Sequence, residues 1–356
     1  MAPQKQSYKN NKKADTKSAK KAVQEDASNL QASPSVPIEV QQLLLDIFKN
    51  TFSERLSSDV QPLLQEIKGH LFNRDFPTAF GKGAYLEAYA ARWSPSRALG
   101  YLQVLNNLKD QITTSPGISA DTSNERRKIV CLGGGAGAEI VALGGFAKMA
   151  RHIDMEDERT RKLEVVAIDM ANWTNVVGRL ADGLLTAPPL SKYASAIAQA
   201  TNAPLLSGDE FGVTFHQHDI LNTDIVTLKP LLEGSGLVTI MFTLNELYST
   251  SISLTQRFLF VLTTCLQPGA LLLVVDSPGS YSSISLNGTE RKYPMQWLLD
   301  HTLLKQGTKD EDPAWEKIQE DESQWFRLPH ELKYPIELEN MRFQLHLYRR
   351  HNVKIE

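Results

Sequence analysis

Glycines and acidic residues stand where apolar runs end in this chain, a pattern that suits the binding of a nucleotide-like ligand. The first such place is a turn that holds Gly133, Gly135 and Gly137 between the apolar residues 129–132 and the periodic apolar segment 140–149. Glycine allows positive φ and close approach of a ligand to the main chain, and a helix N-terminus offers unpaired N–H groups. The order strand, glycine-rich turn, helix therefore predicts a ligand site at the carboxyl ends of parallel strands.

Two aspartates end later apolar runs in the same way. Asp169 follows the apolar residues 165–168, and Asp219 comes shortly after the run 212–216. A carboxylate at the end of a parallel strand can accept hydrogen bonds from ribose hydroxyls, whereas either aspartate can instead cap a helix. The interval between the glycines and Asp169 exceeds the usual roughly twenty residues, and we attribute the excess to a surface loop over the polar residues 154–159.

The glycine pattern by itself leaves the ligand open. Gly133, Gly135 and Ala138 match the G-x-G-x-x-G/A pattern of dinucleotide-binding folds, which allows NAD. Gly133, Gly135 and Gly137 also match G-x-G-x-G, the form used by S-adenosylmethionine-dependent methyltransferases, which this region resembles. A tight turn between a strand and a helix would need the same glycines without any ligand. The further elements that follow in the expected order favour a ligand.

A polar turn after the apolar run 237–242 lies where such a sheet presents groups to a second substrate. Asn245 can donate to the carbonyl of a base, Glu246 can accept from a ring N–H, and Tyr248 can stack on a base. A polar capping turn explains Asn245 and Glu246 equally well. On the helical turn after the glycines, Glu139 either faces an amino group of the ligand or complements the helix dipole, and we favour the dipole.

One upstream segment, residues 91–101, is dense in basic, aromatic and hydroxyl side chains. Arg97 lies within it and can pair with a carboxylate of the ligand, because a guanidinium binds a carboxylate through charge-assisted hydrogen bonds. A surface turn with a serine N-cap explains the same residues, so both interpretations of the segment stay open.

Other catalytic chemistries find little support in the residues. Cys131 and Cys265 lie inside apolar runs, which predicts reduced thiols in the core and no disulfide. No cysteine–histidine cluster has metal-ligand spacing, so we expect no metal. His216 and His218 belong to no convincing Ser-His-Asp arrangement, which argues against covalent hydrolase chemistry.

Composition and charge predict a globular chain with a basic N-terminal tail. Of the 356 residues, 42% are hydrophobic and 22% are charged. The longest apolar stretch, 258–275, is interrupted by polar residues, so we expect no membrane span. Residues 1–21 hold seven lysines and one aspartate, a net charge of +6 that leaves −9 for the rest of the chain. We expect residues 1–36 to be a disordered tail that serves as a nuclear or nucleolar address, as an RNA tether, or only as a solvated segment.

The periodicity of apolar residues divides the rest of the chain into two regions. Residues 37–126 are expected to be helical, and residues 127–356 alternate between strands and helices, with insertions at about 172–208 and 280–330. The expected helices of the first region are 38–52, 56–71, 85–93 and, after Pro95, 98–108.

The second region predicts a doubly wound, mostly parallel α/β sheet. Its expected strands are 129–132, 163–168, 212–216, 237–242 and 270–275, with a helix at 254–266. The last segment, 341–349, alternates between apolar and polar residues, which predicts an antiparallel edge strand with one wet face.

Four segments together resemble the fungal family of 25S large-subunit rRNA base methyltransferases, and most of all its members that methylate uridine at N3. The resemblance covers residues 38–356 and is carried by 129–139, 165–169, 218–221 and 242–248. It implies the class I methyltransferase fold, a Rossmann-like seven-stranded sheet, and S-adenosylmethionine as the cofactor. It also implies that rRNA or a pre-ribosomal particle is the partner. With the basic tail as a possible address, we expect a nuclear or nucleolar location, with a cytoplasmic one as the alternative.

The resemblance implies roles for Asp219 and Ile220, and the residue chemistry above supplies the roles of the other candidates. Asp219 would hydrogen-bond the adenine amino group, and Ile220 would pack on the adenine ring. The remaining cofactor-binding residues would be Gly133, Gly135, Gly137, Asp169 and Arg97, with Arg97 on the methionine carboxylate. Asn245 and Glu246 would be catalytic, with Glu246 as the base that removes the imide proton of uracil.

Two rival functions remain open at this point. An NAD-dependent oxidoreductase would use the same glycine turn, although about 125 residues precede the turn here and such a fingerprint commonly opens its domain. A ribosome-assembly factor could keep the methyltransferase fold without turnover. Binding of both cofactors and methylation of unmodified rRNA would separate these possibilities.

Overall fold

A computed structural model describes residues 36–57, 59–115, 127–150, 162–279, 281–286, 289–305 and 313–351. The expected tail at 1–36 and the loop at 154–159 fall outside the described residues, except for Val36. Within the described part of the chain, no helix is long and apolar enough to cross a membrane.

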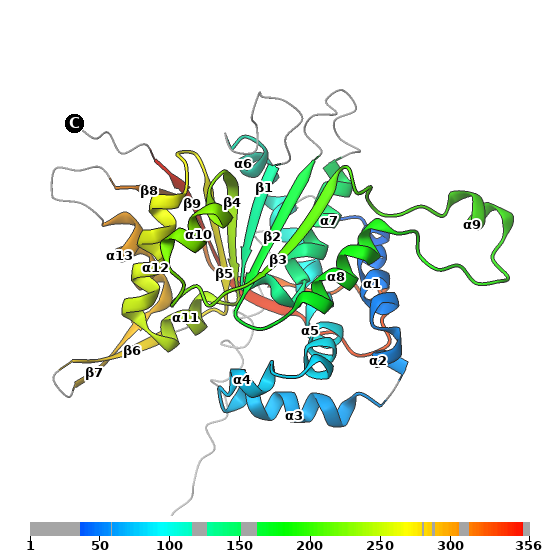
Figure 1. The fold of residues 1–356 in the computed structure, drawn as a ribbon, viewed down its shortest axis with the longest axis horizontal. Helices are drawn as coiled ribbons and strands as arrows, with labels where there is room; N and C mark the ends of the chain where they lie inside the picture. The colour runs from blue at the N-terminus through cyan, green and yellow to red at the C-terminus, as the bar shows by residue number, and fades with distance from the viewer. Residues whose placement is uncertain are drawn as a thin grey trace, which may run out of the picture. The chain divides into compact units, whose positions relative to one another are not determined.

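The centre of the structure is a seven-stranded sheet with the strand order β3-β2-β1-β4-β5-β9-β8 (Figure 1). The strands are β1 Arg127–Leu132, β2 Leu163–Asp169, β3 Phe211–Gln217, β4 Ser235–Met241, β5 Leu271–Asp276, β8 Trp315–Phe326 and β9 Met341–Arg350. The first five in this order are parallel, and β9 runs antiparallel to both β5 and β8. This is the expected doubly wound class I methyltransferase arrangement, with its topological switch point between β1 and β4.

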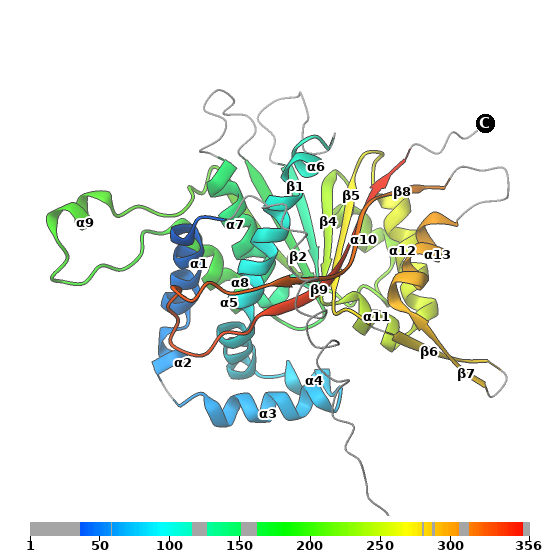
Figure 2. The ribbon, with the colours of Figure 1, turned by 180° about the vertical axis from the view of Figure 1, so that it is seen from behind.

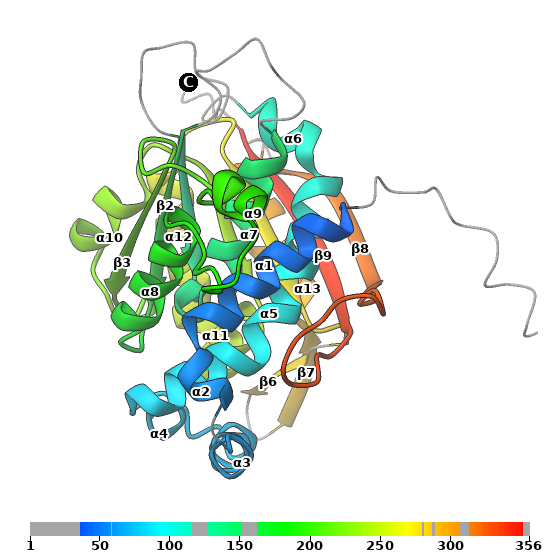
Figure 3. The same ribbon diagram turned by 90° about the vertical axis from the view of Figure 1, so that its right-hand side faces the viewer.

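Helices cover both faces of the sheet. On one face α1 (Ile38–Thr51), α5 (Gly83–Asn107), α7 (Ala138–Ala150) and α8 (Thr174–Leu185) share one hydrophobic cluster, and Figures 1 to 3 show them side by side. On the other face α10 (Ile225–Leu232), α12 (Ile252–Cys265) and α13 (Met295–Leu304) share a second cluster. Successive residues of β1 alternate between the two clusters, as a strand buried on both faces requires.

The shorter elements complete the chain. They are α2 (Ser53–Ser57), α3 (Gln61–Phe72), α4 (Phe76–Ala79), α6 (Lys109–Thr113), a 3-10 turn (Gly134–Ala136), α9 (Ala196–Thr201), α11 (Leu244–Thr250) and the hairpin β6 (Tyr281–Leu286) and β7 (Thr289–Pro294). The five expected parallel strands and the helices at 38–52 and 254–266 are confirmed, with ends that differ by no more than two residues. The helix expected at 56–71 is instead divided between α2 and α3.

The helical region differs from expectation at Pro95. Two helices were expected on either side of this proline, but α5 runs through it without a break. Proline has no N–H, so the carbonyl of Ala91, four residues earlier, loses its helical donor. The hydroxyl of Tyr334 donates to this carbonyl at 2.8 Å and replaces the lost hydrogen bond.

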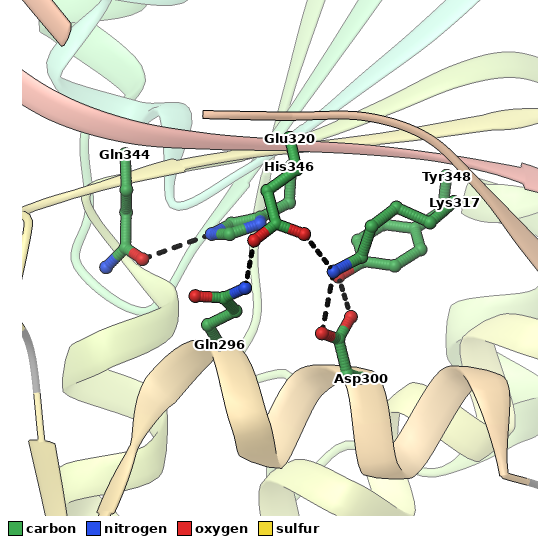
Figure 4. A network of polar contacts seen from close by, with 7 residues as sticks. All are labelled: Gln296, Asp300, Lys317, Glu320, Gln344, His346 and Tyr348. Carbon is green, nitrogen blue, oxygen red and sulfur yellow. Dashed lines mark hydrogen bonds and ion pairs between the residues drawn. The ribbon is translucent and has the colours of Figure 1, made fainter. Parts of the chain in front are cut away.

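The last strand also differs from expectation. An edge strand with one wet face was expected, but β8 lies outside β9, and the polar residues Gln344 and His346 are buried (Figure 4). Gln344 Nε2 donates to Ser277 O at 2.7 Å, and His346 Nε2 lies 3.1 Å from Gln344 Oε1. The alternation of apolar and polar residues predicted the polar face of β9 correctly. That face is nevertheless buried, which is possible because its polar side chains are hydrogen-bonded.

An ion-pair network joins this covered face to α13. Lys317 Nζ contacts Asp300 at 2.6 Å and Glu320 at 2.5 Å, and the hydroxyl of Tyr348 donates to Asp300 at 2.7 Å (Figure 4). Burial lowers the pKa of His346, which favours its neutral form. The network fixes β8 and α13 against β9, opposite the first half of β5.

Candidate functional site

The glycine turn lies where it was expected, at the carboxyl end of β1. Gly133 and Gly137 adopt φ of +79° and +80°, left-handed conformations that favour glycine, and they flank the 3-10 turn. Gly133 N donates to Ile168 O at 2.8 Å, which ties the turn to the end of β2. Helix α7 begins one residue after Gly137.

Protein side chains occupy the space where a Cβ atom of each of the three glycines would lie. A Cβ atom on Gly133 would lie 2.2 Å from Thr243 Oγ1, and one on Gly135 would lie 2.0 Å from Trp173 Cδ1. A Cβ atom on Gly137 would lie 2.2 Å from Leu180 Cδ1. Packing therefore requires glycine at these positions whatever ligand binds, and a ligand can meet this turn only on its main-chain side.

Asp169 lies directly beside the glycine turn. Its Oδ2 accepts from Gly135 N at 3.2 Å, and its Oδ1 accepts from Ala171 N at 3.1 Å. Burial raises the pKa of this carboxyl, and the hydrogen bonds from the backbone oppose the rise. The glycines and the carboxylate that the sequence predicts for one site are thus adjacent.

Asp219 and Ile220 follow β3 at the same edge, because His218 N donates to Asp169 O at 2.9 Å. Asp219 Oδ1 accepts from Leu221 N at 3.0 Å, and its Oδ2 accepts from a neighbouring asparagine at 2.7 Å. Ile220 is 7% exposed and packs in the second hydrophobic cluster. Asp219 therefore organises its own turn, and the contacts of both residues with a ligand stay predictions.

Arg97 lies in the middle of α5, so the surface turn considered for residues 91–101 is wrong. Its Nη1 donates to the hydroxyl of Tyr89 at 2.8 Å. Its guanidinium lies 5.1 Å from the centroid of the Phe242 ring, at the end of β4. The helical region thus delivers a cation to the carboxyl edge of the sheet.

Phe242 itself has an unusual backbone. Its φ is 54°, a left-handed conformation that is rare for a bulky side chain. Its N–H donates to Val275 O at 2.7 Å, and the next residue, Thr243, packs against Gly133. Strain of this kind persists where surrounding contacts enforce it, and it is frequent at functional sites.

Glu139 points into the core, which overturns the helix-dipole interpretation. Its carboxyl is 4% exposed and accepts from Thr239 Oγ1 at 2.5 Å. Burial raises its pKa to about 8, so the group is mostly protonated and uncharged at neutral pH. An uncharged carboxyl beneath the glycine turn does little for the dipole of α7.

The predicted polar turn after β4 begins α11. Asn245 N donates to Asp276 Oδ2 at 2.9 Å, while Asn245 Oδ1 is buried and has no partner among the described residues. Glu246 is partly exposed and lies 3.5 Å from Arg74. Tyr248 is 1% exposed and belongs to the core, so it does not offer a stacking surface for a base.

Asp276 at the end of β5 is a candidate that sequence reasoning missed. It is 3% exposed, and its Oδ1 accepts from Ser277 N at 2.7 Å. Its pKa is raised to about 6, mainly by burial and also by Glu246, while the hydrogen bonds from the backbone and the charge of Arg97 oppose the rise. The sequence contains the pattern that could have identified it, because Asp276 ends an apolar run as Asp169 does.

Aromatic residues of the helical region also reach this edge. Phe80, beside α4, lies 5.4 Å from Trp173 and 5.3 Å from Tyr89, centroid to centroid. Trp173 in turn packs on Gly135, and its side chain also interacts with the Asp169 carboxylate, which lowers the pKa of that group. Sequence reasoning did not anticipate this cluster, because its members are far apart in the chain.

Metal and thiol chemistry receive no support from the described residues. They contain no group of three or more His, Cys, Asp or Glu side chains that could hold a metal ion. Cys131 and Cys265 are buried free thiols. Burial raises the pKa of both thiols, which keeps them in the unreactive protonated form.

Known proteins resemble the chain in sequence over most of its length. Residues 48–349 match the family described as "Putative SAM-dependent methyltransferase". The chain is 34% identical over 329 residues to the 25S rRNA (uridine(2843)-N(3))-methyltransferase of Saccharomyces cerevisiae, across 86% of this chain and 85% of the yeast protein. These matches overturn the NAD-dependent oxidoreductase that the glycine pattern left open.

Solved structures give a weaker similarity. The N-methyltransferase NodS of Bradyrhizobium japonicum, in complex with S-adenosyl-L-homocysteine, is 12% identical with a TM-score of 0.35, over 75% of this chain and 97% of that one. An S-adenosylmethionine-dependent methyltransferase of Methanosarcina mazei is 12% identical with a TM-score of 0.34, over 64% of this chain and 93% of that one. Because these scores are low, the assignment rests on the sequence matches. The chain belongs to this family of S-adenosylmethionine-dependent methyltransferases, and S-adenosylmethionine is its cofactor.

Proposed function

We propose that this protein transfers a methyl group from S-adenosylmethionine to N3 of a uridine in the large-subunit (25S) rRNA. The observation that carries the proposal is the 34% identity, over 86% of the chain, to the yeast 25S rRNA uridine N3-methyltransferase. The substrate would be rRNA or a pre-ribosomal particle.

The residues at the carboxyl edge suit this cofactor. We propose that the amino-acid part of the cofactor lies against the main chain of the turn at Gly133, Gly135 and Gly137, and that the Asp169 carboxylate holds its ribose. The same proposal places Asp219 and Ile220 at the adenine and Arg97 at the methionine carboxylate. A buried polar atom without a partner among the described residues, Asn245 Oδ1, supports a polar ligand here.

The acceptor would lie beside the ends of β4 and β5. When bound, the cofactor supplies a methyl group that is already activated on a sulfonium, so the protein contributes mainly alignment of the two substrates. Asn245 Oδ1 has no partner among the described residues, and Asp276 engages only the main chain of Asn245, so the side-chain amide of Asn245 is available to contact the base. N3 lies on the Watson–Crick edge of uracil, so the target uridine must be unpaired or flipped out.

A general base must remove the weakly acidic imide proton. Glu246 was the residue expected from the sequence, but it is partly exposed and faces Arg74. We infer that Asp276 is the better candidate, because it is buried next to Asn245 and burial raises its pKa to about 6. A base with a pKa near the working pH combines a large ionised fraction with good proton affinity.

The location of the protein is a further part of the proposal. Seven lysines among residues 1–21 support a nuclear or nucleolar address, where rRNA is made, with the cytoplasm as the alternative. Fluorescence microscopy of the full-length chain and of a chain with these lysines changed to glutamine tests this point. Unchanged nuclear signal in the altered chain would contradict the tail as an address.

The proposed activity is tested by mapping rRNA modifications in cells that lack the gene. N3 methylation blocks the Watson–Crick edge and should arrest reverse transcription at the modified uridine. We expect one such arrest site in 25S rRNA to vanish without the gene and to return with the wild-type gene. It should not return with a gene that carries Asp169→Ala. Return of the mark with this variant, or no lost site at all, would contradict the proposal.

A further inference from the structure

An exposed tryptophan with two arginines close to its ring lies beyond the proposed acceptor site. Trp325, near the end of β8, is 52% exposed. The guanidinium carbons of Arg327 and Arg342 lie 4.9 Å and 5.8 Å from the centroid of its ring. We name Trp325, Arg327 and Arg342 the tryptophan platform.

The strand register places this platform next to the acceptor site. On β9, Gln344 is paired with Asp276, and its side chain donates to Ser277 O at 2.7 Å. Arg342 precedes Gln344 by two residues, so the two side chains share a face of β9 and are about 7 Å apart along the strand. Trp325 is the direct partner of Arg342 on β8. The platform therefore continues the sheet just past the end of β5.

The cations of the platform are available to a partner. Within the described residues, neither Arg327 nor Arg342 forms an ion pair with a carboxylate, and Arg342 Nε donates to the Ser323 hydroxyl at 2.9 Å. The nearby carboxylate of Asp321 accepts from Ser323 N and Gln324 Nε2. Beyond the basic tail, the chain carries a net negative charge, so two unpaired arginines on one aromatic ring are a local exception.

An exposed ring with flanking guanidiniums suits single-stranded nucleic acid. Unpaired bases stack on tryptophan, and guanidinium groups bind the phosphates between them. We propose that the tryptophan platform binds the single-stranded RNA that flanks the target uridine, with a base on Trp325 and phosphates on Arg327 and Arg342. This inference rests on the proposed RNA substrate, and it adds the surface that holds the RNA.

Fluorescence anisotropy with the full-length chain and a labelled 12-nucleotide oligouridylate tests the inference. Trp325→Ala should weaken binding about tenfold, because stacking of one base contributes on the order of 1–3 kcal/mol. Trp325→Phe should keep most of the affinity. Arg327→Gln together with Arg342→Gln should reduce the slope of log affinity against log salt by about 1.4, since each phosphate contact on a single strand contributes about 0.7.

The chain offers a matched control for the tryptophan. Tyr193 is 83% exposed and has Lys192 5.1 Å from its ring centroid. It lies in the segment between α8 and α9, which projects on the side of the sheet away from β8 (Figures 1 and 2). Tyr193→Ala should leave oligouridylate binding unchanged, and the thermal midpoint and S-adenosyl-L-homocysteine affinity of each variant show that its fold is intact.

Each outcome of these measurements either supports or contradicts the role of the tryptophan platform. The inference is overturned if Trp325→Ala binds as the wild type does, if Tyr193→Ala weakens binding equally, or if the wild-type chain does not bind the single strand. Methyl transfer to unmodified 25S rRNA is measured in parallel. If the wild type transfers the methyl group and Trp325→Ala changes neither binding nor transfer, the platform is wrong and the proposed function is still supported. If the wild type transfers no methyl group, the proposed function itself is contradicted.

Discussion

The carboxyl edge of the sheet has two halves that are built differently. Beside β1, β2 and β3, the glycine turn, Asp169 and Asp219 form a half in which each aspartate hydrogen-bonds its own turn, and the turns are joined between neighbouring strands. Asp169 accepts from Ala171, and Asp219 accepts from Leu221, each two residues away. Beside β4, β5 and β9, the contacts join distant parts of the chain, such as Asn245 to Asp276 and Gln344 to Ser277.

This difference separates the part of the site that short sequence segments specify from the part that depends on tertiary packing. The first half depends on short segments whose backbone conformation is specified by their own residues. The second half depends on the packing of α5, α11 and the β8–β9 pair against one another. We therefore expect substitutions in the first half to change cofactor binding and those in the second half to change turnover.

The largest effect is expected in the second half, for Asp276→Asn. If Asp276 is the base, kcat should fall by about 100-fold or more, because general base catalysis contributes roughly 10²–10⁴-fold. In the wild type, kcat should rise with pH as a carboxyl of pKa about 6 loses its proton, and this limb should disappear in the variant. Glu246→Gln is the matched control and should change kcat little. A large fall of kcat in Glu246→Gln with little change in Asp276→Asn would instead identify Glu246 as the base.

In the first half, Asp169→Ala should reduce the affinity for S-adenosylmethionine by about 100-fold. Two hydrogen bonds from ribose to an ionised acceptor contribute about 1.5–3 kcal/mol each, so this value is at the low end. Asp219→Ala should cost about tenfold or less, because a single hydrogen bond would be lost. Calorimetry measures both, and an unchanged affinity for Asp169→Ala would remove this residue from the cofactor site.

Glu139→Gln tests the buried carboxyl between the two halves. In the folded state its pKa is about 8, above the 4.5 of an ordinary glutamic acid. Its stabilising contribution is therefore complete below pH 4.5 and is lost as the pH rises through 8. The glutamine variant should nearly equal the wild type at pH 4 and should exceed it in unfolding free energy by a few kcal/mol at pH 9. Urea titrations at both pH values measure this, and equal differences at the two pH values would contradict a buried neutral carboxyl.

The smallest effects concern the packing of the glycine turn against α8. Gly135→Ala would place a Cβ atom 2.0 Å from Trp173 and should lower the unfolding free energy by about 1–3 kcal/mol. On α8 itself, Gly178 has nothing within 4 Å of an added Cβ atom, so Gly178→Ala should raise the unfolding free energy by up to about 1 kcal/mol. Destabilisation by both substitutions would show that the packing described here is wrong.

The same contrast explains what the sequence could predict. The five parallel strands could be predicted, because each is a mainly apolar run, and glycine or an acid stands at the end of β1, β2 and β5. The continuity of α5 through Pro95 could not, because it depends on the hydroxyl of Tyr334, more than two hundred residues away. The burial of Gln344 and His346 depends likewise on partners supplied by β8, α13 and the end of β5.

The candidate site follows the same rule. The adjacency of Gly135 and Asp169 could be expected from strand order alone. The sequence shows that Asp276 ends an apolar run, but its burial beside Asn245 and Arg97 depends on tertiary packing. The tryptophan platform pairs Trp325 with Arg342 through the register of two antiparallel strands, which no local pattern specifies.

Methyl transfer by the purified chain is the most direct test of the central claim. Unmodified 25S rRNA is incubated with the protein and S-adenosylmethionine that carries a labelled methyl group, and the product nucleosides are identified by mass spectrometry. We expect labelled N3-methyluridine with the wild-type chain and none with Asp169→Ala. Cofactor binding without any transfer would contradict the account and would leave a protein that keeps the methyltransferase fold without turnover.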